Sequence, residues 1–103
     1  MAKVFEADGV VTLKLSRFEK IGALHGDISV ASSNLISKTD VLNPWTKEYL
    51  RGFRAPGTGI PYVILLGTMR FKGGKDFCAI YKRTPAMIYE FADAPFKRWI
   101  VSI

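Results

Sequence analysis

The sequence contains one cysteine, one histidine and no long apolar run, and each shortage excludes a class of protein. A single cysteine, Cys78, cannot form an internal disulfide. Together with His25 it supplies two ligands, whereas a tetrahedral zinc site needs three or four. The longest uncharged segment, between Arg54 and Arg70, is shorter than the roughly 20 apolar residues that cross a bilayer. We therefore expect no metal site and no transmembrane segment.

The first residues, MAKVFEADG, also lack the long apolar core of a secretory signal, and together with the lone cysteine this predicts a cytoplasmic location. Of the 103 residues, 49% are hydrophobic and 13% are aromatic, which is enough to form a core and excludes intrinsic disorder. A chain of this length has no room for a second core, so we expect a single domain over residues 1–103.

Positive charge is concentrated in the second half of the chain. The net charge is +6, from 15 basic and 9 acidic residues. Residues 51–103 carry nine of the basic groups and three of the acidic ones. Basic strand ends keep an apolar domain soluble, and if they gather on one rim they attract nucleic acid or anionic lipid. These residues are Arg70, Lys72, Lys75, Lys82, Arg83, Lys97 and Arg98.

A hairpin and a short helix are predicted at the start of the chain. Asp8-Gly9 lies between two runs of β-forming residues, which is typical of a hairpin with strands at about 3–7 and 10–15. Ser16 and Glu19 then match a capping box, which predicts a helix over about 17–22 that ends at Gly22.

The next segment predicts two more strands and a long loop. Residues 27–30 and 34–42 are extended runs separated by the turn residues Ser32-Ser33-Asn34. Residues 43–61 contain three prolines and three glycines, which favours a long loop with one helical turn at 46–50.

Four strands are predicted in the remainder, as a meander over 63–71, 75–83, 86–91 and 96–103. Their residues are apolar on both faces rather than alternating, so the second face of the sheet must be covered. A helix, the long loop or a partner subunit would provide that cover.

Catalytic residues are scarce. Cys78 is flanked by Phe77 and Ala79 within a predicted strand, which is typical of a buried structural thiol, although a dyad with His25 stays open. Five carboxylates could pair across strands, but their spacing gives no specific reason for it: Glu6, Asp8, Asp27, Asp40 and Glu90. We expect a non-enzymatic protein without a cofactor.

The segment GFRAPGTG, from Gly52 to Gly59, has the glycine separation of a phosphate-binding loop but has Thr58 where that loop needs lysine, which excludes nucleotide hydrolysis. Glycine-rich backbone can still present N–H groups to an anion, or the glycines can simply shape the loop. The candidate contacts for an anion or a partner are Arg51, Arg54, Gly57, Thr58, Lys72 and Lys75.

Specific nucleic-acid recognition is not expected. The aromatic residues of the predicted strands indicate core positions rather than a stacking surface, and RNP-type motifs are absent. These aromatic residues are Phe71, Phe77, Tyr81, Tyr89, Phe91 and Trp99.

Three stretches, LRGFRAPGTGIP, LGTMRFKGGKDFCAIYKR and DAPFKRWIVSI, resemble a family of small uncharacterised bacterial proteins similar to pleckstrin-homology (PH) domains. The resemblance covers about residues 4–103, and RAPGTG and APF-x-R-x-IVS are its specific parts. It implies a PH-like fold, with two packed antiparallel sheets of about seven strands in a partly open barrel. The C-terminal helix that normally closes this barrel has no residues left after Ile103.

The resemblance does not imply phosphoinositide binding, because the first hairpin loop, Ala7-Asp8-Gly9, is short and acidic. A PH-like fold is a scaffold for binding and brings no catalytic residues with it. We therefore expect a binding or assembly module that self-associates or binds a protein partner through its uncovered apolar end. The alternative is an anion-binding module for a membrane surface or nucleic acid, acting through Arg51, Arg54 and the basic strand ends.

Overall fold

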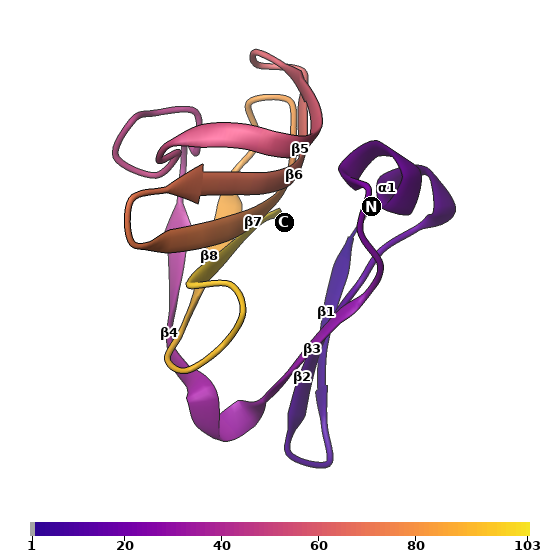
Figure 1. Ribbon diagram of the computed structural model, residues 1–103, viewed down its shortest axis with the longest axis vertical. Helices are drawn as coiled ribbons and strands as arrows, with labels where there is room; N and C mark the ends of the chain where they lie inside the picture. The colour runs from indigo at the N-terminus through magenta and orange to yellow at the C-terminus, as the bar shows by residue number, and fades with distance from the viewer. Residues whose placement is uncertain (1) are drawn as a thin grey trace.

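The computed structural model describes residues 2–103 and forms two β-sheets and one short α-helix (Figure 1). The smaller sheet is antiparallel, in the order β1-β2-β3, with β1 (Lys3–Ala7), β2 (Val10–Lys14) and β3 (Ile28–Ala31). The larger sheet has the order β4-β8-β9-β7-β6-β5. Its strands are β4 (Leu35–Val41), β5 (Phe53–Ile60), β6 (Ile64–Phe71), β7 (Gly74–Tyr81), β8 (Ala86–Phe91) and β9 (Arg98–Ser102). The mainly-β, two-sheet fold is confirmed, with nine strands instead of about seven, and the sheets are not closed into a barrel.

The predicted hairpin and helix start are present. Asp8 and Gly9 have φ values of 53° and 75°, the left-handed conformations that a tight hairpin turn requires. The helix α1 (Arg17–Ala23) begins with the Ser16–Glu19 capping box. The prediction that Gly22 ends the helix is wrong, because Leu24 takes the left-handed conformation that terminates it.

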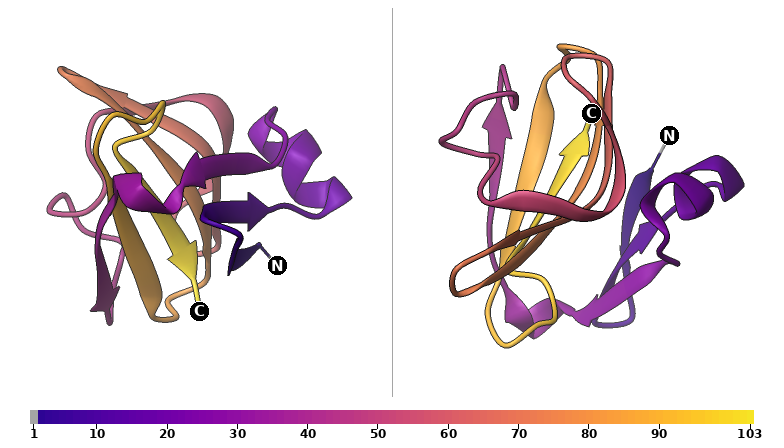
Figure 2. Two further views of the ribbon diagram at one scale, coloured as in Figure 1. Left: turned by 90° about the horizontal axis from the view of Figure 1, so that it is seen from below. Right: turned by 45° about the horizontal axis from the view of Figure 1, so that its top comes forward.

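Gly22 instead lets the helix approach the larger sheet. A β-carbon at this position would lie 3.0 Å from Cδ1 of Leu66 in β6. On the neighbouring strand β5, the hydroxyl of Thr58 donates a hydrogen bond of 2.7 Å to the carbonyl oxygen of Gly22. The helix and the smaller sheet therefore lie together on one side of the larger sheet (Figure 2).

The predicted meander is wrong in its strand order. β9 lies between β7 and β8, parallel to β7 and antiparallel to β8. The physical reason is burial on both faces: Trp99, Ile100 and Val101 are all buried, which a central strand allows and an edge strand does not. Turn residues between successive strands cannot indicate that β9 lies between β7 and β8. They determine the geometry of the turn, and not which strands lie side by side in the sheet.

The long loop is shorter than predicted. It ends at Gly52, and the RAPGTG segment lies in β5, an edge strand paired with β6. Pro56 is tolerated there because the pairing register shifts between Arg54 and Gly57, where a ladder N–H is not needed. The predicted turn at 46–50 is present, with Leu50 N donating to Thr46 O at 2.8 Å.

Each face of the larger sheet packs on a different cover. The inner face contacts the smaller sheet through residues such as Phe77 and Trp99. The outer face is covered by the loop between β4 and β5, whose Trp45, Tyr49 and Leu50 pack on it. Of the three covers considered, the long loop is the one observed. No helix among residues 2–103 has the length and apolar character to span a membrane.

Candidate anion-binding site

A basic pocket opens where the start of β5 meets the β6–β7 hairpin and the segment before β9. Its volume is about 590 Å³. The lining residues are Phe53, Arg70, Phe71, Lys72, Gly74, Lys75 and Pro95. The hairpin brings Arg70 opposite Lys75 and so gathers basic residues at one end of the sheet. Part of the predicted basic rim is therefore a concave site.

The cations of this pocket have no acidic counterpart in the part of the chain that the structure describes. Within the described residues, Arg70, Lys72 and Lys75 form no ion pair with a carboxylate. The guanidinium Nε of Arg70 donates to the carbonyl oxygen of Ala55 at 2.7 Å, which holds this side chain against β5. Uncompensated positive charge over a concave surface produces an electrostatic potential that attracts anions.

Lys97 adds a further cation beside the pocket. Its aliphatic stem crosses Gly74, where a β-carbon would lie 2.8 Å from Cε of the lysine. The ammonium of Lys75 lies 4.8 Å from the ring centroid of Phe96, so the aromatic ring orients it. Glycine at position 74 therefore leaves room for the Lys97 stem to cross the hairpin beside the pocket.

A buried ion cluster stands behind the pocket. Asp76 is fully buried and accepts hydrogen bonds from Arg51, with Nε 3.1 Å from Oδ2 and Nη2 3.0 Å from Oδ1. Arg98 donates to Oδ2 of the same carboxylate, with its Nη2 at 2.8 Å. The guanidinium of Arg51 also lies 4.0 Å from the ring centroid of Phe71, a wall of the pocket. The single Asp76 carboxylate thus compensates one of the two guanidinium charges. The second guanidinium charge adds to the positive potential at the pocket.

The six predicted contact residues separate into three groups. Lys72 and Lys75 line the basic pocket, and Arg51 lies behind it, bound to Asp76. Arg54 points away, along a second pocket beside Trp45, with its guanidinium packed over Gly59. Gly57 and Thr58 have structural contacts farther along β5. Gly57 lies against β6, where a β-carbon would come within 2.9 Å of Cα of Gly67, and the Thr58 hydroxyl donates a hydrogen bond to α1. The structure does not bring these last three residues to the basic pocket.

Cys78 and His25 lie on opposite faces of the larger sheet. Cys78 packs in the outer cluster, and burial raises the pKa of its thiol. His25 contacts Phe77 and Phe96 on the inner side, with ring centroids 5.5 and 5.4 Å away. The geometry of a Cys/His dyad is therefore absent here, and residues 2–103 contain no group of three side chains suited to a metal ion.

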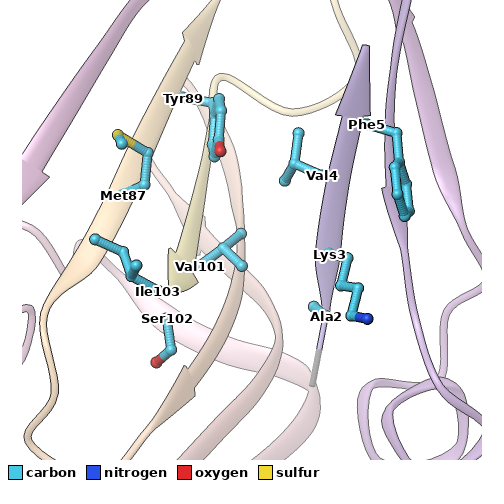
Figure 3. Close-up of a pocket in the computed structure, with 9 residues that line it drawn as sticks. All are labelled: Ala2, Lys3, Val4, Phe5, Met87, Tyr89, Val101, Ser102 and Ile103. Carbon is cyan, nitrogen blue, oxygen red and sulfur yellow. The ribbon is translucent and has the colours of Figure 1, made fainter. Parts of the chain in front are cut away.

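An apolar groove separates β1 from β8 and β9 (Figure 3). Its volume is about 370 Å³, and Val4, Tyr89 and Val101 face one another across it. Burial raises the pKa of the Tyr89 phenol, with a further contribution from the charge of Asp40. Phe5 points to the other side of β1 and is about half exposed.

Sequence reasoning missed Asp76 and Phe53. Asp76 becomes significant only when β7 and β9 are known to be neighbours, because its partner Arg98 is remote in sequence. Phe53 fell within the predicted loop, and no signal marked it as exposed. Together with the lysines of the hairpin, these residues define a mainly-β protein with a basic, aromatic-walled pocket.

Comparisons of the chain with protein-family models, with curated proteins and with solved structures gave no match. The PH-like resemblance therefore stays a prediction carried by the sequence motifs alone.

Proposed function

We propose that the chain is a non-enzymatic binding module that holds a phosphate-bearing anion in the basic pocket. The observation that supports this function is the convergence of Arg70, Lys72 and Lys75 on one concavity, where none of the carboxylates of residues 2–103 pairs with them. Arginine and lysine are the side chains that proteins use most for phosphate, through charge-assisted hydrogen bonds. Solubility alone does not require that the cations line a pocket.

Self-association is expected in part because the strands are apolar on both faces, and this ground is weaker in the structure. The apolar outer face of the larger sheet is covered by Trp45, Tyr49 and Leu50, so it needs no partner subunit. The anion-binding alternative therefore becomes the leading candidate, with a pocket that supports it directly.

The test is a calorimetric titration of the protein with inorganic polyphosphate at 20 and at 150 mM salt. We expect the double variant Lys72→Glu/Lys75→Glu to bind at least about tenfold more weakly than the wild type. The matched control is Lys3→Glu/Lys14→Glu, which makes the same charge change at two exposed, paired positions of β1 and β2. Equal losses in both double variants, or no binding at 20 mM salt, would refute a site at the pocket.

Self-association remains a second candidate because of the free edge of β1. β1 pairs with β2 on one side, and the apolar groove borders its other side. An edge strand of this kind can pair with the same strand of a second copy, and antiparallel twofold pairing centred on Phe5 would bring the two half-exposed rings together. Light scattering after size exclusion should then show a dimer that Phe5→Lys converts to monomer, whereas a wild-type monomer at every accessible concentration contradicts the idea.

A further inference from the structure

We infer that the ligand of the basic pocket is single-stranded nucleic acid, with phosphates on Arg70, Lys72 and Lys75 and a base stacked on Phe53. This inference rests on the proposed anion-binding function and adds the class of ligand. It concerns binding that tolerates any sequence, and it agrees with the expectation that specific nucleic-acid recognition is absent.

Phe53 is an exposed aromatic ring within a cationic site. It begins the edge strand β5, pairs with Arg70 of β6 and lines the pocket, and 63% of its surface is exposed. Aromatic side chains farther inside the larger sheet behave differently, since Phe77 of β7, Phe91 of β8 and Trp99 of β9 are buried. An exposed ring beside cations offers a stacking face next to phosphate-binding groups, which is the combination that single-strand-binding proteins use.

Phe71, the other ring of the pocket, already has a stacking partner. The Arg51 guanidinium lies 4.0 Å from its centroid and is itself fixed by the buried carboxylate of Asp76. One face of Phe71 is therefore occupied, while no cation or ring is stacked on Phe53 among the described residues. Phe53 is the ring available to a base.

The pocket geometry favours a single strand over a duplex. In a duplex the base faces are stacked on one another, so a protein ring reaches them only when the strand is unpaired. The pocket volume of about 590 Å³ also lies in the range of small-ligand sites, which accommodates one nucleotide rather than a double helix. No described helix borders the pocket to enter a groove of DNA.

The experiment compares four probes by fluorescence anisotropy or competition: a labelled 12-residue oligothymidylate, an abasic oligomer of the same length, polyphosphate and phosphatidylserine vesicles. The variants are Phe53→Leu, which keeps an apolar side chain but removes the ring, and Phe53→Tyr, which keeps the ring. Phe18→Leu is the matched control, because Phe18 is 61% exposed on α1.

We expect Phe53→Leu to weaken oligothymidylate binding by about 5- to 150-fold, the range for loss of one stacked base. Phe53→Tyr and Phe18→Leu should stay within about threefold of the wild type. Binding of the abasic oligomer and of polyphosphate should be insensitive to Phe53→Leu. Three phosphate contacts predict that oligothymidylate affinity falls about 20-fold between 50 and 200 mM salt.

The outcomes separate this inference from the proposed function. If polyphosphate binds and Phe53→Leu leaves oligothymidylate binding unchanged, the nucleic-acid assignment is wrong and the anion site stands. If vesicles bind more tightly than oligothymidylate and Phe53→Leu preserves that binding, the ligand is a membrane surface. If no anion binds at 20 mM salt, both proposals fail.

Discussion

Asp76 and Arg98 occupy facing positions on the parallel strands β7 and β9, with Oδ2 of the aspartate 2.8 Å from Nη2 of the arginine. The same carboxylate binds Arg51, and Arg98 also donates to the carbonyl oxygen of Tyr49. One buried acidic group therefore joins two strands to the loop that covers the outer face. It also positions the Arg51 guanidinium that stacks on Phe71 in the basic pocket.

Replacing this carboxylate should destabilise the whole domain. Asp76→Asn leaves two guanidinium groups near one neutral amide, and Arg98 is mostly buried. We expect a loss of about 2–4 kcal/mol in the free energy of unfolding, measured by urea denaturation. The control is Glu48→Gln, an exposed carboxylate of the same loop, which should change stability by less than about 0.5 kcal/mol. Similar effects of the two substitutions would contradict a structural role for the cluster.

Glu19 should make stability depend on pH. Burial opposes its ionisation, but hydrogen bonds from the Ser16 backbone and from the Tyr81 hydroxyl, at 2.5 Å, outweigh burial and lower the pKa of Glu19 below 4.5. A lowered folded-state pKa contributes stability above the unfolded value, and the contribution disappears as pH falls through the folded value. Glu19→Gln should therefore cost about 1–2 kcal/mol at pH 7 and progressively less below pH 4.5, as measured by urea denaturation at each pH. A cost that is constant from neutral to strongly acidic pH would contradict this.

Tyr81→Phe tests the other partner of that hydrogen bond. Burial, followed by the Glu19 carboxylate, raises the pKa of the Tyr81 phenol, so the hydroxyl remains a donor at neutral pH. Its removal takes one donor from a buried carboxylate and should destabilise the fold by about 1 kcal/mol or more at pH 7. The folded-state pKa of Glu19, followed by NMR titration, should rise in this variant. An unchanged titration would show that the hydrogen bond does not influence Glu19.

Cys78 should resist alkylation in the folded protein. The thiol is fully buried between strands, so the reagent cannot reach it. Burial also raises its pKa, so the reactive thiolate does not form. We expect no labelling by iodoacetamide at pH 8 over an hour, detected by mass spectrometry, and complete labelling in denaturing urea. Rapid labelling of the native protein would reopen a catalytic role for this residue.

Gly67→Ala should detach β5 from the larger sheet. Gly67 has a φ of 139°, and a β-carbon there would meet the carbonyl oxygen of Pro56 and lie 2.7 Å from Cα of Gly57. Both the strained backbone and the collision with main-chain atoms predict a loss of about 2–4 kcal/mol in unfolding free energy. Gly26→Ala is the control, because a β-carbon at Gly26 meets no atom within 4 Å. Amide hydrogen exchange should show the loss of protection concentrated in residues 53–60 and in β6.

Features with a local cause could be predicted from the sequence. The Asp8-Gly9 turn and the Ser16–Glu19 capping box depend on residues within four positions of one another, and the structure contains both. The position of β9 depends instead on which strand fills the middle of the sheet, a choice made by packing across the whole chain. A pattern read along the sequence carries no information about that choice.

The candidate site was partly predictable for the same reason. Lys72 and Lys75 are adjacent to a tight hairpin, so their convergence follows from the turn alone. Phe53 and Asp76 acquire their roles through pairings with residues more than 15 positions away, Arg70 and Arg98. The prolines and glycines of 52–61 indicated a loop because most strands exclude them, but an edge strand with a shifted register accommodates them.

The central position of β9 also governs the order in which the larger sheet can assemble. The first three strands and the β5–β7 ladder can form without β9, since each of their strands pairs with a neighbour in the chain. β8 and β4 reach β7 only through β9 and must wait for residues 98–102. Until β9 inserts, the facing edges of β7 and β8 carry unpaired backbone N–H and C=O groups, so completion of the larger sheet depends on this one strand.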